Sequence, residues 1–108
     1  MRNSSESRAR RHYRLRGYRI LGTNVWIAGY ELDLVVRRGR VLAFVEVKSK
    51  AGTGFGSPEE MVTPEKQRRV RTAAQAWLAR NPAHAGCRIR FDVVAERAGK
   101  LELLAAAF

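Results

Sequence analysis

Four ionisable residues occupy positions where strand cores are usually apolar. Glu31 and Asp33 alternate within one predicted strand, and Glu46 and Lys48 end the next one. Because side chains alternate along a strand, each pair is expected to share one face. The dipeptide Arg38-Gly39 predicts a tight turn between the two strands. If both pairs choose the same side, three carboxylates and one ammonium group converge.

Such a group of side chains suits a divalent cation. Burying acids without compensation is costly, and Mg²⁺ or Mn²⁺ prefers oxygen ligands. Asp33, Glu46 and the main-chain carbonyl of Val47 would form half of its coordination shell. The alternative is a solvent-exposed ladder of ion pairs, which the spacing alone does not exclude. Placement favours the chemical interpretation, since the second pair ends a very apolar segment and the glycine-rich stretch 51–56, expected to be a mobile loop, follows at once.

The remaining pattern predicts an α/β fold in which helices flank a mixed sheet. Alternation in the second strand places Leu32, Leu34 and Val36 on the face opposite the carboxylates. A capping box at 57–60 and the pair Thr63-Pro64 each predict a helix start. The order is therefore α-β-β-β-α-β-β. The expected elements are helices at 5–16 and from 63 to Asn81-Pro82, and strands at 18–27, 31–37, 41–48, 88–96 and 100–104.

The second helix carries one polar residue on its apolar face. Lys66 falls at helical spacing with Val62, Val70, Ala73 and Trp77. Lys66 is therefore a candidate helper of the predicted site. The alternative, which the sequence supports equally well, is that Lys66 lies in the first helical turn and only extends its ammonium group to solvent.

Length and composition limit the class of protein. A chain of 108 residues predicts one domain, with the ends 1–4 and 105–108 expected to be flexible. The lack of a long apolar run argues against a membrane protein and favours the cytoplasm. One cysteine and two histidines exclude an internal disulfide and a structural zinc site within this sequence.

The charge balance predicts a polyanionic partner. The net charge is +11 and most of the excess is arginine, whose guanidinium group matches phosphate oxygens. DNA is the expected partner, and a merely solvated arginine-rich surface is the alternative. The candidate nucleic-acid contacts are Lys50, Lys66, Arg69, Arg37, Arg38 and Arg11. Tyr18, Trp26, Tyr30 and Phe55 are candidate stacking surfaces, although core packing is the favoured expectation for each of them.

Several ordered motifs resemble one family. They are Gly17-Tyr18-Arg19-Ile20-Leu21, Glu31-Leu32-Asp33-Leu34-Val35, Phe44-Val45-Glu46-Val47-Lys48, Thr63-Pro64-x-Lys66 and Arg90-Phe91-Asp92-Val93-Val94. Together they resemble the YraN family of small bacterial proteins over nearly the whole chain. That family looks like a minimal restriction-endonuclease-like fold of the PD-(D/E)xK nuclease group. The resemblance implies a nuclease with a Mg²⁺ or Mn²⁺ cofactor, and it also allows a homodimer, since many nucleases of the group act in pairs.

The resemblance also implies roles for individual residues. Asp33 matches the motif aspartate, while Glu46 and Lys48 match the acid and the lysine of the E-x-K element. Glu31 matches a family glutamate, and Glu6 matches an acid on the first helix that can approach the same site. Tyr30 departs from the family pattern, because a glycine commonly precedes that glutamate.

Two functions from different classes follow. The first is metal-dependent hydrolysis of phosphodiester bonds in DNA, with Asp33, Glu46 and Lys48 as the central residues. Branched or damaged DNA is the candidate substrate. The second is a non-catalytic nucleic-acid-binding module that uses the basic surface alone. A scaffold that docks on another protein is a weaker third possibility.

Overall fold

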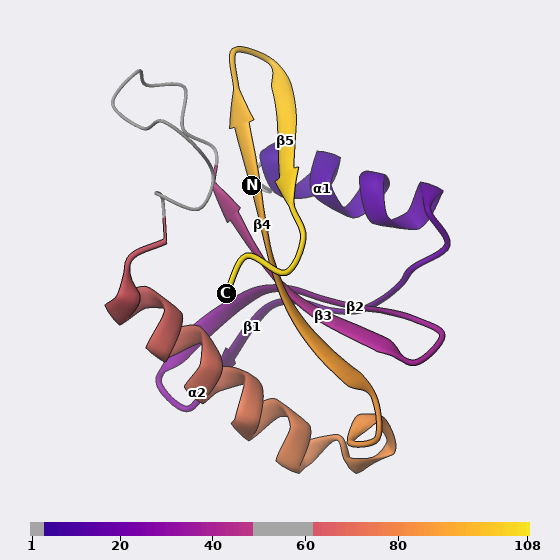
Figure 1. Ribbon diagram of the computed structural model, residues 1–108, viewed down its shortest axis with the longest axis vertical. Coiled ribbons are helices and arrows are strands. Elements are labelled where there is room, and N and C mark those ends of the chain that lie inside the picture. Colours follow the sequence, from indigo (N-terminus) through magenta and orange to yellow (C-terminus); the bar gives the residue numbers. More distant parts are fainter. Residues whose placement is uncertain (1–3, 49–61) are drawn as a thin grey trace.

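The computed structural model describes residues 4–48 and 62–108, and it forms one five-stranded sheet with a helix on either side (Figure 1). This confirms the predicted α/β class, its mixed sheet and the order of its elements. The elements are α1 (Ser4–Leu15), β1 (Arg19–Ile27), β2 (Tyr30–Arg38), β3 (Val41–Lys48), α2 (Pro64–Arg80), the 3₁₀ turn η2 (Pro82–His84), β4 (Arg88–Arg97) and β5 (Lys100–Leu104).

The sheet has the simple strand order β1-β2-β3-β4-β5. All neighbouring strands are antiparallel except β3 and β4, which run parallel from Val41↔Arg88 to Lys48↔Ala95. A parallel pair needs a long crossover, and the segment containing α2 provides it. Thr63 begins α2 as predicted, since its side chain accepts a hydrogen bond from the Lys66 N–H at 3.2 Å. The predicted capping box at 57–60 lies outside the described residues.

The two helices pack on apolar clusters from opposite faces of the central strands. Under α2, Phe44 of β3 meets Trp77 edge to face, with ring centroids 5.8 Å apart. Under α1, Tyr13 and Ala9 pack on Leu34 and other β2 and β3 residues of the opposite face. Because β2 and β3 are covered on both sides, the polar residues at their ends stand out as exceptions in a buried segment.

One face assignment from the sequence is wrong. Leu32, Leu34 and Val36 are predicted to share one face, but Leu34 and Val36 belong to the cluster under α1 and Leu32 belongs to the cluster under α2. The β2–β3 ladder begins only at Leu34↔Val45, so the start of β2 pairs with β1 alone. Two-stranded ribbons twist more strongly than wide sheets, and strict alternation therefore does not carry through this part of β2.

The end of the chain contacts β4. The Ala107 N–H donates to the carbonyl of Phe91 at 2.7 Å, and the Phe108 ring stacks on Phe91 at 5.0 Å. The Ala106 N–H donates at 3.0 Å to Asp92, which is fully buried and also accepts hydrogen bonds from Tyr13 and Arg90. Ring stacking and two hydrogen bonds thus connect the last three residues to β4.

Candidate active site

The predicted carboxylates of β2 and β3 lie together where the two strands separate. Asp33 is 9% exposed and Glu46 is 6% exposed. Asp33 Oδ2 accepts a hydrogen bond from the Val47 N–H at 2.8 Å, just beyond the last ladder pair, Leu34↔Val45. The aspartate side chain thus takes the place of a main-chain acceptor, which both ends the ladder and fixes the carboxylate.

Burial makes this pair of acids unusual. Burial, and then the neighbouring charge of Glu46, raise the pKa of Asp33 to about 7. Burial likewise raises the pKa of Glu46, against the opposing effects of Lys48 and Lys66. Two adjacent carboxyl groups that resist losing both protons form a site that a cation or a shared proton would stabilise.

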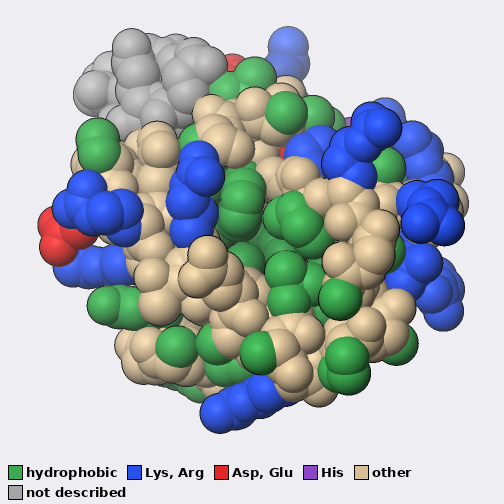
Figure 2. Space-filling model, turned by 60° about the horizontal axis from the view of Figure 1, so that its bottom comes forward, with side chains coloured by type: hydrophobic (Ala, Val, Ile, Leu, Met, Phe, Trp, Pro, Cys, Tyr) green, Lys and Arg blue, Asp and Glu red, His purple; other side chains and the backbone are tan. Residues whose placement is uncertain are grey.

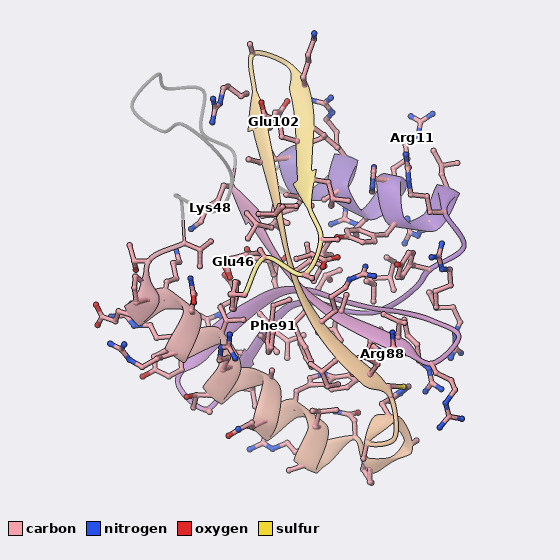
Figure 3. The ribbon with its side chains drawn as sticks, in the orientation of Figure 1. Arg11, Glu46, Lys48, Arg88, Phe91 and Glu102 are labelled. Atoms are coloured by element: carbon pink, nitrogen blue, oxygen red, sulfur yellow. The ribbon has the colours of Figure 1, made fainter. Side chains whose placement is uncertain are left out.

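A lysine completes the predicted trio. The Lys48 Nζ lies 3.8 Å from Glu46 Oε1, and the Lys48 side chain is only 21% exposed. Burial lowers the pKa of Lys48, as does the neighbouring Lys66 side chain, whereas Glu46 raises it. Lys66 lines the same cavity as Lys48 and is partly exposed. Figure 3 shows Glu46 and Lys48 together at the end of β3.

These side chains open into a cavity of about 500 Å³ between β2, β3 and the start of α2. Glu6 of α1 reaches its wall and accepts hydrogen bonds from Asn24 Nδ2 at 3.1 and 3.2 Å. Glu31 lines the cavity but is exposed. The cavity lining consists of Glu6, Trp26, Gly29, Tyr30, Glu31, Asp33, Glu46, Val47, Lys48, Lys66, Arg69 and Val70. The volume is within the range of small-ligand sites.

The donor set fits a hard divalent cation. Within residues 4–48 and 62–108, no three Asp, Glu, His or Cys side chains are grouped closely enough to form a metal site by themselves. Two carboxylates, Asp33 and Glu46, are however the usual protein share for Mg²⁺, which keeps several waters. Both pKa values are raised, so a bound cation would stabilise the ionised forms of the two carboxyl groups. The predicted third ligand, the Val47 carbonyl, belongs to a residue of the cavity wall.

A pH dependence of stability follows from the buried acids. The folded pKa of Asp33 lies above its ordinary value of 3.8, so the folded state binds the proton more tightly than the unfolded state does. The contribution of Asp33 to the free energy of unfolding in EDTA is therefore full below pH 4. We expect it to fall as pH rises to about 7, by on the order of 4 kcal/mol for Asp33 alone.

Urea denaturation of the wild-type and Asp33→Asn proteins between pH 4 and pH 8 would measure this effect. The asparagine variant should become the more stable of the two as pH rises, because it has no carboxyl group to ionise at this position. A stability difference that does not change with pH would contradict the environment described for Asp33.

The predicted nucleic-acid contacts divide into two groups. Lys66 and Arg69 line the cavity. Arg37 and Arg38 lie at the other end of β2, about 13 Å or more along the strand from Asp33. Arg37 donates to the Gly39 carbonyl, and Arg38 donates to the Arg16 carbonyl. Arg11 is exposed on α1, and Lys50 lies outside the described residues.

Two aromatic side chains at the cavity differ from the sequence expectation. Trp26 is 71% exposed and Tyr30 is 37% exposed, so neither is a core residue, whereas Tyr18 is buried as expected. Phe55 lies outside the described residues. Asn24, the partner of Glu6, has a positive φ of 49°, and its sequence position gave no sign of that contact. Tyr30 stands before Glu31, where the family commonly has a glycine, and its partly exposed ring lies on the cavity wall.

Comparison with known proteins decides the family. The model of the uncharacterised protein family UPF0102 matches residues 5–95, which include every element from α1 into β4. The chain belongs to this family. This UPF0102 membership confirms the YraN-type resemblance found in the motifs.

Relatives in several bacteria are similar over much of the chain. The UPF0102 protein of Bordetella avium is 41% identical over 96% of this chain and 71% of its own length. That of Yersinia pseudotuberculosis is 41% identical over 95% of this chain and 89% of its own. That of Geobacter sulfurreducens is 48% identical over 72% of this chain and 60% of its own. In the described part of this UPF0102 chain, no helix has the length and apolar character needed to cross a membrane.

Proposed function

We propose that this UPF0102 protein hydrolyses phosphodiester bonds in DNA with the help of Mg²⁺ or Mn²⁺. One observation carries the proposal: Asp33 and Glu46 are buried side by side with raised pKa values, next to Lys48, in the wall of an open cavity. Ionisable groups perturbed in this way are concentrated at functional sites. The net charge of +11 supports a polyanionic substrate.

Each side chain has a role in that reaction. Asp33 and Glu46 would hold the cation, and the Val47 N–H fixes the orientation of Asp33. A bound Mg²⁺ or Mn²⁺ supplies Lewis-acid stabilisation of the phosphate and acidifies water. Lys48 would orient the attacking water and offset negative charge on the phosphate oxygens. A bond forms from the water oxygen to phosphorus, the bond to one sugar oxygen breaks, and that oxygen takes a proton.

Glu6 and Glu31 extend the negative end of the site. Glu6 is fixed by Asn24 and Glu31 is exposed on the cavity wall. Both side chains would bind water around the cation rather than hold it directly. A cleavage assay with end-labelled single-stranded, duplex and branched DNA, in MnCl₂ and in EDTA, tests the proposed function. Cleavage that requires the metal supports it, whereas its absence from every substrate contradicts it.

A second candidate function, DNA binding without cleavage, is favoured by the distribution of charge. Exposed arginines converge on the end of the sheet remote from the cavity, where the Arg88 N–H donates to the Arg40 carbonyl at 2.7 Å. Figure 2 shows this blue group on the right-hand side of the molecule. No carboxylate of the described segments lies in the second half of α1, in the β2–β3 turn or at the start of β4. We call this surface the basic end, and its exposed members include Arg14, Arg19, Arg40 and Arg88.

We expect the basic end to contribute to DNA affinity. Changing Arg40 to glutamate removes one phosphate contact and adds repulsion, so the affinity for a duplex in EDTA should fall about tenfold at 0.1 M salt. The slope of log affinity against log salt should become shallower by about one. Fluorescence anisotropy over a range of salt concentrations measures both quantities.

Lys100→Glu is the matched control for this variant. It makes the same change in net charge at an exposed position of the β4–β5 hairpin. We expect it to leave the salt slope unchanged. Equal effects of the two variants would show that only net charge matters and would contradict a localised basic end.

We also propose a cytoplasmic location and a pair of chains acting on two DNA strands. The cytoplasm is where chromosomal DNA is available in a bacterium, and a homodimer would present two cavities to a duplex. Sedimentation equilibrium with and without DNA tests the pairing, which requires a mass close to twice 12.2 kDa.

A further inference from the structure

The β1–β2 hairpin presents an unusual exposed aromatic surface beside the cavity. Trp26 is 71% exposed, whereas Trp77 is 6% exposed in the core under α2. A tryptophan normally buries a large apolar area, and one that stays exposed on the wall of a cavity often marks a binding surface. No residue of the described segments stacks on the Trp26 ring.

The hairpin fixes the backbone position from which this ring projects. Ala28 and Gly29 form its two-residue turn with φ values of 55° and 81°, as a type I′ turn requires. Trp26 pairs with Glu31 across the ladder, and Ile27 pairs with Tyr30. Trp26 therefore projects from a strand and not from a loose loop. Its Cα is expected to lie about 8 Å from that of Asp33, two residues along β2 and one strand across.

The surroundings of the ring favour a nucleotide. The Arg69 guanidinium lies 6.0 Å from the centre of the Tyr30 ring, and both residues share the cavity wall with Trp26. Lys66 and Lys48 add positive charge to the same wall, which also carries four carboxylates, those of Glu6, Glu31, Asp33 and Glu46. An aromatic surface next to cationic side chains is the combination that binds a nucleobase together with its phosphate. An ordinary apolar ligand would need no such charge.

We propose that Trp26 stacks on an unpaired nucleobase within one or two nucleotides of the phosphate that enters the cavity. A base inside a duplex has both faces covered by its neighbours, so only an unpaired base offers a free face to the ring. This inference deepens the proposed function and rests on it for the position of the phosphate. It assigns DNA with unpaired nucleotides at the reacting phosphate as the substrate class.

Tryptophan fluorescence tests the stacking without any cleavage. We expect a short oligothymidylate, added in EDTA, to quench a solvent-exposed emission that is missing from the Trp26→Phe variant. Trp26→Ala should weaken binding of the oligothymidylate about 10- to 100-fold and binding of a duplex by less than about twofold. Trp26→Phe, which keeps an aromatic face, should stay within about threefold of the wild type.

Leu103→Ala is the matched control, because Leu103 is an exposed apolar residue, 40%, on β5, outside both the cavity lining and the basic end. It should change neither affinity. Equal losses on the two DNAs, or tight binding without quenching of Trp26, would overturn the proposal. Emission of Trp26 that is already shielded in the free protein and varies with protein concentration would assign the hairpin to self-association and would also overturn it. These titrations are run in EDTA and involve no cleavage. Failure of the nuclease proposal would therefore not by itself produce any of the three outcomes that overturn the stacking proposal.

Discussion

Replacing Asp33 by asparagine is expected to lower metal-dependent DNA cleavage by about 1,000-fold or more. The carboxylate is one of the two charged groups available to hold the cation, and the cation is worth several kcal/mol of transition-state stabilisation. The fold should survive, because the asparagine side-chain oxygen can still accept the hydrogen bond that the Val47 N–H gives at 2.8 Å. Single-turnover cleavage of a labelled DNA in MnCl₂ measures the loss.

Glu102→Gln is the matched control for that experiment. Glu102 is a carboxylate on β5, away from the cavity (Figure 3). Neutralising it should leave the cleavage rate within about twofold of the wild type. If Asp33→Asn cleaves as fast as Glu102→Gln does, Asp33 is a structural residue and the proposed metal site is wrong.

Replacing Lys48 by methionine should separate metal binding from catalysis. The flexible apolar chain of methionine keeps most of the volume of the lysine stem, but it removes the charge that lies 3.8 Å from Glu46. We expect cleavage to fall about 100- to 1,000-fold, which is typical when one preorganised charge at a reacting phosphate is removed. The affinity for Mn²⁺ should change by less than about tenfold, because both carboxylates remain.

The control for the lysine is Lys100→Met, which removes the same charge from an exposed position. The rate is measured at saturating DNA and saturating Mn²⁺, so that weaker binding does not imitate slower chemistry. Unchanged cleavage in Lys48→Met would contradict the assignment of Lys48 to the reacting phosphate. A parallel loss of Mn²⁺ affinity and rate would instead show that the lysine acts only through the metal site.

The central carboxylates were predictable because their environment is local. Glu46 ends an apolar run, and a two-residue turn fixes which residues of β2 and β3 are neighbours. Short-range period and turn chemistry are sufficient for that inference. The raised pKa of Asp33 depends in addition on burial, which the sequence suggested through the apolar residues that flank it.

Other parts of the site depend on tertiary structure. The exposure of Trp26 depends on how far the hairpin extends beyond β3, and alternation does not specify that length. The basic end joins arginines from α1, β1, the β2–β3 turn and β4, which are distant in sequence. The contacts of the last residues involve the buried Asp92, whose partners lie in α1, in β4 and near the end of the chain. No local pattern reports such contacts.

Calorimetric titration of Mn²⁺ into the wild-type, Asp33→Asn and Glu46→Gln proteins tests the metal site most directly. We predict one site per chain in the wild type, with protons released on binding near pH 7 because the pKa of Asp33 is raised to about 7. Affinity should fall at least tenfold in each variant. Equal Mn²⁺ binding by all three proteins, or no binding by the wild type, would contradict the assignment of Asp33 and Glu46 as the metal site.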